Sequence, residues 1–330
     1  MSPASIRLPA ARARQPRHTA EASAILTIDL GAIRANYRLL RDRLGDAACA
    51  GVVKADAYGL GAAEVARALL REGCRTFFVA QLEEGIALRD TVGASPDIYV
   101  LNGIFPGSAP ACVDAGLMPV LNSAAQARDW ALAAQGLHRK LPAALQVDCG
   151  MARLGMPPAE FAQIMGDATC REHIDFRLVM SHLACADEPD HPANRQQLAE
   201  FGRLRALLPA VPASLANSSG IFLGSAYRHD LARPGAALYG VNPTPGQPNP
   251  MRPVARLAAR VIQTRDVQAG DGIGYAHVAV ADRTMRLATI ALGYADGWHR
   301  NAAAAAFHAG VRLPFVGRVS MDSIILDISA

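Results

Sequence analysis

The chain has 330 residues, of which 51% are apolar, which is enough for a large core and a smaller second unit. Its formal net charge is only +4, without a basic helix or interleaved aromatic residues, so a nucleic-acid partner is not expected. No apolar run approaches the roughly 18 residues that span a bilayer, so no membrane partner is expected either.

The first segment, residues 1–21, is basic. Its arginines and one histidine have no acidic residue among them up to position 18, which is typical of a solvated, flexible tail. The tail lacks the apolar core of a secretory signal, so we expect a cytoplasmic protein. Six scattered cysteines without a C-x-x-C pair indicate small core residues and no metal site.

From residue 22 to residue 248, short apolar or β-branched runs alternate with helix-like segments. This alternation predicts parallel βαβ units. Eight such runs favour a TIM (β/α)8 barrel, with a doubly wound sheet as the alternative. The predicted strands are 48–55, 76–81, 97–102, 118–123, 143–150, 176–184, 212–218 and 236–241.

The pattern changes at the segment PTPGQPNP, residues 243–250. Four prolines in eight residues cannot continue a helix or a central strand. Alternating β-type sequence follows, interrupted by the glycine-rich turn at 269–272. We therefore predict a mainly β domain over residues 249–330.

Polar residues stand where the barrel strands should end, and active sites on this fold lie at the carboxyl ends of the strands. Any one of them has an ordinary explanation as a surface charge or a satisfied core group. Several on one rim favour a site. These residues are Lys54, Asn102, Asn122, Asp148, His182, Asn217 and Ser218.

The last two predicted strands carry features of a phosphate site. Ser218 and Ser219 offer hydroxyl groups after the seventh strand, and Gly220 and Gly235 allow a close approach of the backbone to an anion.

A desolvated lysine such as Lys54 forms Schiff bases. A lysine opposite a phosphate cradle suggests pyridoxal phosphate. Arg233, predicted just before or into the eighth strand, is then a candidate for the ring nitrogen, where it can only donate.

At this point the sequence resembles a family, the pyridoxal-phosphate alanine racemases of fold type III. The similarity extends from about residue 24 to residue 328 in order and spacing. It is carried by the segments VVKADAYGLG (52–61), VDCGMARLG (147–155), SHLACAD (181–187), ANSSG (216–220), RPGAALYG (233–240), GIGYAH (272–277), LGYADGW (292–298) and GRVSMD (317–322).

The resemblance implies a two-base racemase that interconverts L-alanine and D-alanine and supplies D-alanine for peptidoglycan. Lys54 would bind the cofactor as a Schiff base and act as the base on one face of the substrate. Tyr275 would act on the other face from the partner subunit of a homodimer. Since a phenol is a weak base at neutral pH, His182 and Arg233 would assist it as a hydrogen-bonded chain.

The resemblance also implies binding roles. The cofactor-binding set would be Lys54, Tyr58, Arg153, His182, Asn217, Ser218, Arg233, Gly235 and Ala236. The substrate would contact Arg153 and the partner's Met321. The channel through which substrate arrives would carry Asp187, Tyr294 and Arg318.

Two features depart from the family pattern. Gln146 stands where many members have a lysine, carbamylated in some, and a glutamine cannot form a carbamate. The sequence ends at Ala330, whereas family members continue into strands with a further phosphate-binding tyrosine. We therefore expect a β domain that is short at its C-terminus.

Several alternatives remain at the level of sequence. One is a racemase of broad specificity, for example for serine, and another is a chain that binds cofactor with little turnover. A fold type III decarboxylase is disfavoured because Arg233 replaces the acidic residue that faces the ring nitrogen in those enzymes. A single-barrel cofactor-binding protein is disfavoured by the presence of the β domain.

Overall fold

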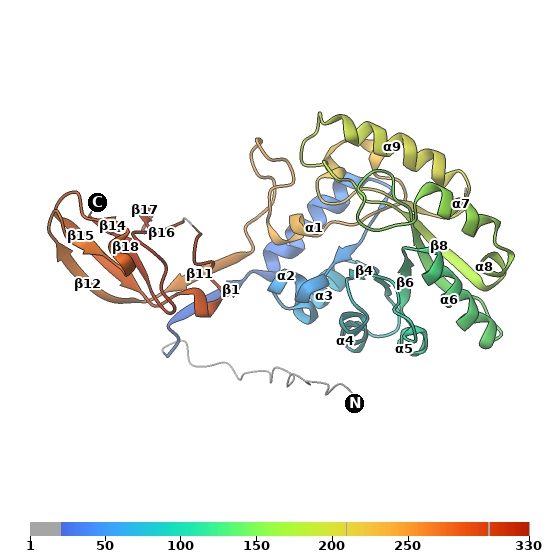
Figure 1. The fold of residues 1–330 in the computed structure, drawn as a ribbon, viewed down its shortest axis with the longest axis horizontal. Helices are drawn as coiled ribbons and strands as arrows, with labels where there is room; N and C mark the ends of the chain where they lie inside the picture. The colour runs from blue at the N-terminus through green and yellow to red at the C-terminus, as the bar shows by residue number, and fades with distance from the viewer. Residues whose placement is uncertain (1–20, 209, 303, 330) are drawn as a thin grey trace. The chain divides into compact units, whose positions relative to one another are not determined.

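The structure, a computed structural model, describes residues 21–208, 210–302 and 304–329. The predicted tail, 1–21, lies almost entirely outside the described residues. The chain divides into two compact units (Figure 1): a barrel unit, Ile28–Ala255, and a β unit that joins the segment ending at Thr27 to the segment starting at Arg256. The predicted boundaries, 22 and 249, differ because strand β1 (Ala24–Ile28) pairs with β11 (Ala255–Ala259).

A parallel sheet runs through the barrel unit in the order β3-β4-β5-β6-β7-β8-β9. Strand β10 (Leu231–Ala232) pairs in parallel with β2 (Ala48–Cys49), which leads into β3. On its other side β10 meets β9, since Arg233 N–H donates to the carbonyl of Ala216 at 2.9 Å. The strands of the sheet are β3 (Gly51–Val52), β4 (Thr76–Val79), β5 (Asp97–Val100), β6 (Met118–Leu121), β7 (Leu141–Gln146), β8 (Ile174–Met180) and β9 (Ala213–Ser214).

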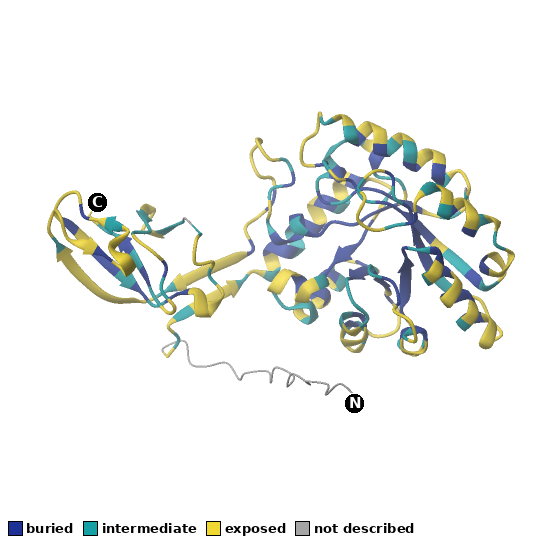
Figure 2. Cartoon of the chain, in the orientation of Figure 1, coloured by how far each residue is buried: buried dark blue, intermediate teal, exposed yellow. Residues whose placement is uncertain are grey.

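These contacts close the sheet, so the predicted eight-stranded barrel is confirmed and the doubly wound alternative, with two open edges, is wrong. Buried strands lie inside a ring of helices that expose one face (Figure 2). Phe78 and Tyr99 stack inside the barrel with ring centroids 5.0 Å apart. The helices are α1 (Leu30–Leu44), α2 (Lys54–Gly59), α3 (Ala62–Arg71), α4 (Leu82–Val92), α5 (Ala109–Asp114), α6 (Ala124–Gly136), α7 (Pro158–Gly166), α8 (Ala168–His173) and α9 (Pro192–Arg205), with short 3-10 turns η1 (Gly220–Phe222) and η2 (Ser225–Tyr227) after β9.

The eighth strand is not where the sequence pattern placed it. Residues 236–241 were predicted as a strand, but Ala236–Tyr239 forms a 3-10 turn, η3, and the strand is β10. The prediction was wrong because the apolar run AALY follows a turn at Gly235, whose carbonyl accepts from Leu238 N–H at 2.9 Å, and packs against α1. As a result Arg233 follows the eighth strand and stands at its carboxyl end.

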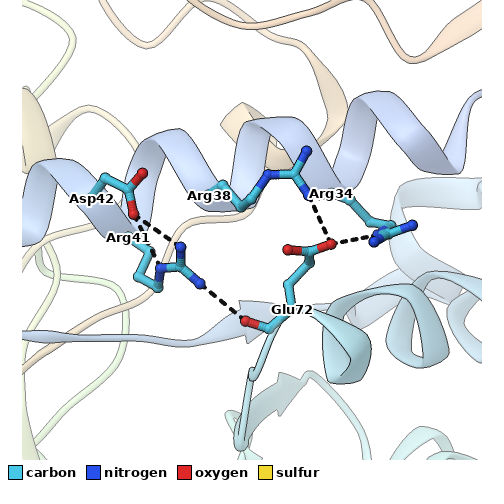
Figure 3. A network of polar contacts seen from close by, with 5 residues as sticks. All are labelled: Arg34, Arg38, Arg41, Asp42 and Glu72. Carbon is cyan, nitrogen blue, oxygen red and sulfur yellow. Dashed lines mark hydrogen bonds and ion pairs between the residues drawn. The ribbon is translucent and has the colours of Figure 1, made fainter.

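A polar cluster joins the first helix to the end of α3 (Figure 3). Arg34 and Arg38 both donate to one carboxylate oxygen of Glu72, at 2.5 and 2.8 Å. Arg41 donates to the backbone carbonyl of the same residue at 3.2 Å. The side chain of Glu72 is largely buried, so this cluster ties α1 to the barrel wall next to β2.

The β unit is mainly β, as predicted. Its largest sheet is antiparallel in the order β12-β15-β18, with Ile290 and Leu326 among its buried side chains. Within the described residues no helix is both long and apolar enough to cross a membrane. The strands are β12 (Val261–Val267), β13 (Gly272–Ile273), β14 (Ala279–Val280), β15 (Met285–Ile290), β16 (Ala305–His308), β17 (Val311–Pro314) and β18 (Ile324–Asp327).

Candidate active site

A cavity of about 650 Å³ opens at the carboxyl ends of the barrel strands, within the range typical of small-molecule sites. Its lining comes from the loops that follow β3, β4, β5, β7, β8, β9 and β10, and all of it belongs to the barrel unit. The barrel residues to which the resemblance gave a catalytic, binding or channel role all line it: Lys54, Tyr58, Arg153, His182, Asp187, Asn217, Ser218, Arg233, Gly235 and Ala236.

Lys54 lies two residues after the end of β3 and begins an unusual turn. The four residues from Ala55 to Tyr58 all have left-handed backbone angles, with φ between 51° and 59°, although none is glycine. Such a conformation costs on the order of 1–2 kcal/mol per residue, so surrounding contacts must hold it. Because of this turn, Lys54 and Tyr58 both face the cavity.

The surroundings of Lys54 lower the pKa of its amine. Burial lowers its pKa, and the positive charge of Arg153 lowers it further, while the carboxylate of Glu84 acts in the opposite direction. A lysine whose charged form is disfavoured is a better nucleophile and base near neutral pH.

In the same cavity as Lys54, the turns after β9 and β10 gather backbone donors. Ser218 Oγ accepts from the N–H groups of Gly235 and Ala237, both at 3.1 Å. A Cβ added to Gly235 would lie 2.3 Å from the hydroxyl oxygen of Tyr58, so glycine is required for the Tyr58 side chain to lie this close to the backbone. The ring of Tyr58 also contacts Tyr239, with centroids 4.7 Å apart. Burial raises the pKa of Tyr58, so it stays a neutral donor.

Arg233 is buried beneath the cavity. Its guanidinium donates to Ser214 Oγ and to the carbonyl of Ser181. Burial lowers its pKa to about 9, so it remains charged at pH 7. His182, next to Ser181, has its pKa lowered to about 3 by burial and then by Arg233, so it is neutral. Among the described contacts these two side chains are not hydrogen-bonded to each other; each lines the cavity separately.

Arg153 is presented by the loop after β7. The carboxylate of Asp148 shapes this loop by accepting from the N–H groups of Gly150, Met151 and Ala152. Gln146 lines the cavity too, but its amide donates to the carbonyl of Leu154 at 3.1 Å and makes no bond to Arg153 in the described structure.

Two of the polar strand-end residues have the ordinary role. Asp148 holds its own loop, and the amide of Asn122 donates to the carbonyls of Leu101 and Val120. Neither lines the cavity, whereas Asn102 does. The strand-end pattern therefore located the rim but did not separate residues that face the cavity from residues that shape loops.

Four predicted site residues belong to the β unit: Tyr275, Tyr294, Arg318 and Met321. They are exposed on that unit. The fractional exposure is 64% for Tyr275 and 57% for Met321, which is high for large side chains of this kind. Tyr275 stands in the 3-10 turn η4 (Tyr275–His277).

Sequence reasoning missed several residues that support the site. Glu84 binds the backbone beside Lys54, and Ser181 and Ser214 accept from Arg233. Tyr239 donates to the carbonyl of Val52 at 2.8 Å, just before Lys54. Only Glu84 carried a signal, as an acid at the third position of a helix, and that signal indicates helix capping.

Comparison with known proteins places the chain. The family model described as alanine racemase, N-terminal domain, matches residues 28–243, and that described as alanine racemase, C-terminal domain, matches residues 254–330. The chain belongs to the alanine racemase family. Figure 1 shows the barrel unit and the β unit to which these matches correspond.

Three members of the alanine racemase family illustrate the similarity. A relative from Mesorhizobium japonicum, named "Alanine racemase, catabolic", is 66% identical over 96% of this chain and 83% of its own length. The crystal structure of alanine racemase from Bartonella henselae with covalently bound pyridoxal phosphate is 43% identical, covers 93% of this chain and 86% of that one, and has a TM-score of 0.89. The biosynthetic alanine racemase of Pseudomonas aeruginosa is 35% identical over 93% and 86% of the two chains, with a TM-score of 0.86.

Proposed function

We propose that this chain is a pyridoxal-phosphate-dependent alanine racemase that interconverts L-alanine and D-alanine. The observation that carries the proposal is a lysine of lowered pKa in one cavity with a turn of backbone donors, hydroxyl groups and a glycine. The family membership and the ligand named for the Bartonella henselae structure support it.

The residues present fit the cofactor. Lys54 would hold it covalently, and Tyr58, Asn217, Ser218, Gly235 and Ala236 would surround its phosphate. The absence of a Cβ at Gly235 lets the hydroxyl of Tyr58 approach this backbone, so that both can contact the phosphate. Bound to an amino acid, pyridoxal phosphate acidifies the Cα–H bond, and this is the chemistry it would supply.

Racemisation requires that a proton leave one face of Cα and return to the other, which two opposed groups do most directly. Lys54 Nζ serves one face, because its lowered pKa lets it alternate between neutral and charged forms. Tyr275 serves the other through its phenol oxygen. Arg153 and the backbone N–H of Met321 hold the substrate carboxylate, and Asp187, Tyr294 and Arg318 line the way in.

Arg233 sets the character of the reaction. A guanidinium has only donors, so Arg233 would leave a ring nitrogen beside it unprotonated and would limit how far negative charge spreads from Cα. This favours return of the proton to Cα over side reactions. His182 stays neutral at pH 7, because burial and three nearby cations disfavour its charged form.

The active site is proposed to be shared in a homodimer. Tyr275 and Met321 stand exposed on the β unit, as residues that reach into a partner's barrel would. We further place the enzyme in the cytoplasm. All six cysteines are free and five are buried, which suits a reducing compartment.

The metabolic direction is a separate matter. Relatives carry both names, catabolic in Mesorhizobium japonicum and biosynthetic in Pseudomonas aeruginosa. The relative with 66% identity is the catabolic one, so supply of D-alanine for peptidoglycan is a proposed use of this activity alongside breakdown of D-alanine. Activity on serine would mark the broader specificity that the sequence leaves open.

The test is to incubate the purified chain with L-alanine and, separately, with D-alanine, and to monitor racemisation by circular dichroism. Wild type should reach the same racemic end point from both sides, Lys54→Ala should be inactive, and Tyr275→Phe should lose most activity in both directions. Lys140→Ala is the matched control. Near-normal rates for Lys54→Ala would overturn the assignment of the site.

A further inference from the structure

Glu84 makes a hydrogen bond that its place in the sequence does not explain. It lies in the first turn of α4, and one oxygen of its carboxylate accepts from the N–H groups of Ala80 and Gln81, at 2.7 and 3.1 Å. Its other oxygen accepts from the N–H of Ala55 at 2.7 Å, a residue 29 positions earlier and directly after Lys54.

The first pair of bonds is ordinary helix capping. Gln81 and Glu84 form a capping box, and an acid at this position is common for that reason alone. The bond to Ala55 is additional. It fixes the start of the left-handed turn to the start of α4, where the backbone of Ala55 has a φ of 51°. The end of the turn is fixed separately, since the carboxylate of Asp56 accepts from Ala62 N–H at 2.7 Å.

The charge of Glu84 also reaches the site. Arg153, Arg233 and the neutral His182 line the same cavity as Lys54, and of the two arginines Arg153 acts on the pKa of its amine. Glu84 is the one carboxylate among the groups that act on the pKa of Lys54, and it raises that pKa against the effects of burial and Arg153. Its neighbour Glu83 is exposed and makes no contact with the turn among the described bonds.

We propose that Glu84 is a positioning residue of the active site: its carboxylate holds the start of the left-handed turn after Lys54 in place and balances the positive charge of Arg153 near the amine. Only the expected effect of Glu84 on catalysis rests on the proposed function. The hydrogen bonds of Glu84 are formed in the chain without cofactor. Removal of the carboxylate should misplace Lys54 without unfolding the barrel, because a glutamine still completes a capping box.

The chain offers a clean test, because it has two lysines, Lys54 and the exposed Lys140. Trace labelling of the cofactor-free full chain with acetic anhydride across a pH series gives the protonation midpoint of each. In Glu84→Gln we expect the Lys54 midpoint to move to lower pH, since an anion beside it is lost, while Lys140 is unchanged. Glu83→Gln, the matched loss of a charge from the same helix turn, should leave both midpoints as in wild type.

The loaded enzyme supplies a second readout. For Glu84→Gln we expect kcat for alanine to fall on the order of ten- to a hundredfold, as for a small misplacement of a reacting group, with little change in KM. An unchanged Lys54 midpoint, or an equal shift in Glu83→Gln, would overturn the proposal. The labelling result does not need racemase activity, so failure of the proposed function would be recognised separately.

Hydrogen exchange of the wild-type chain covers the case in which the variant does not fold. The Ala55 amide should exchange slowly although its residue is exposed, because its N–H is bonded to Glu84. Exchange of this amide at the rate of an unbonded loop amide would contradict the proposal.

Discussion

At the scale of single residues, burial sets the charge states of the site. Burial, with Arg233, Arg153 and Lys54 nearby, lowers the pKa of His182 to about 3, whereas the unfolded chain should titrate at about 6.5. Below pH 6.5 the unfolded state therefore binds a proton that the folded state rejects. Stability must fall as the pH falls through this window.

We predict that the wild-type chain loses about 2 kcal/mol of unfolding free energy from this group between pH 6.5 and 5. Urea unfolding of wild type and His182→Gln at both pH values measures the difference. His229, whose pKa is also lowered by burial, acts in the same direction and is present in both chains. Equal pH dependence in the two chains would show that His182 is not held neutral.

Gly235 gives a second prediction at this scale. Gly235→Ala should displace the hydroxyl of Tyr58, because the new Cβ would lie 2.3 Å from it. Loss of one or two charge-assisted contacts to a phosphate should weaken pyridoxal phosphate binding by about tenfold or more. Fluorescence titration of the cofactor-free chain measures this. Gly136→Ala, on a helix with open space around it, is the control.

At the scale of the elements, the cluster around Glu72 shows how much a partly exposed ion pair contributes to the free energy of unfolding. Arg34 and Arg38 are more than 40% exposed, so solvent screens them and Glu72→Gln should cost only about 1 kcal/mol. The two arginines lower the pKa of Glu72, so this stability is present above its ordinary pKa and is lost as the pH falls below it.

Urea unfolding at pH 7 in low and high salt tests this contribution. The difference between wild type and Glu72→Gln should shrink at high salt. Glu64→Gln, which removes an exposed pair with Arg67, should have a smaller effect. A larger cost for Glu64→Gln would contradict the assignment of the cluster in Figure 3 to the joint between α1 and α3.

The elements also show what sequence patterns can and cannot predict. The strands that precede Lys54, His182 and Ser218 were predictable, because buried parallel strands are continuous apolar runs with a polar residue at the end. The left-handed turn after Lys54 was not, since Ala-Asp-Ala-Tyr contains no glycine and its first N–H is bonded to Glu84 from another helix. The eighth strand was misplaced because a strand of two residues is too short to give an alternating or apolar pattern.

For the whole molecule, the central structural question is whether the site is shared between subunits. Mixing Lys54→Ala chains with Tyr275→Phe chains and allowing subunits to exchange should restore activity. Half of randomly formed dimers pair the two variants, and each such dimer has one intact site of two, so about a quarter of wild-type activity is expected. Activity no greater than the sum of the separate variants would contradict a shared site.

At this scale the two-unit organisation followed from the prolines at 243–250, but the place of the first strand did not. The predicted barrel domain begins at residue 22 and so includes residues 24–28, yet these residues form β1, which pairs with β11. Such a pairing joins segments more than 200 residues apart, and local patterns carry no signal for it.

The most direct test of the central claim is borohydride reduction of the purified chain with pyridoxal phosphate, followed by peptide mapping. With only two lysines the result is unambiguous. The account predicts one phosphopyridoxyl group per chain, on Lys54, with Lys140 unmodified. A chain that racemises alanine while Lys54 stays unmodified, or one labelled only at Lys140, would contradict it.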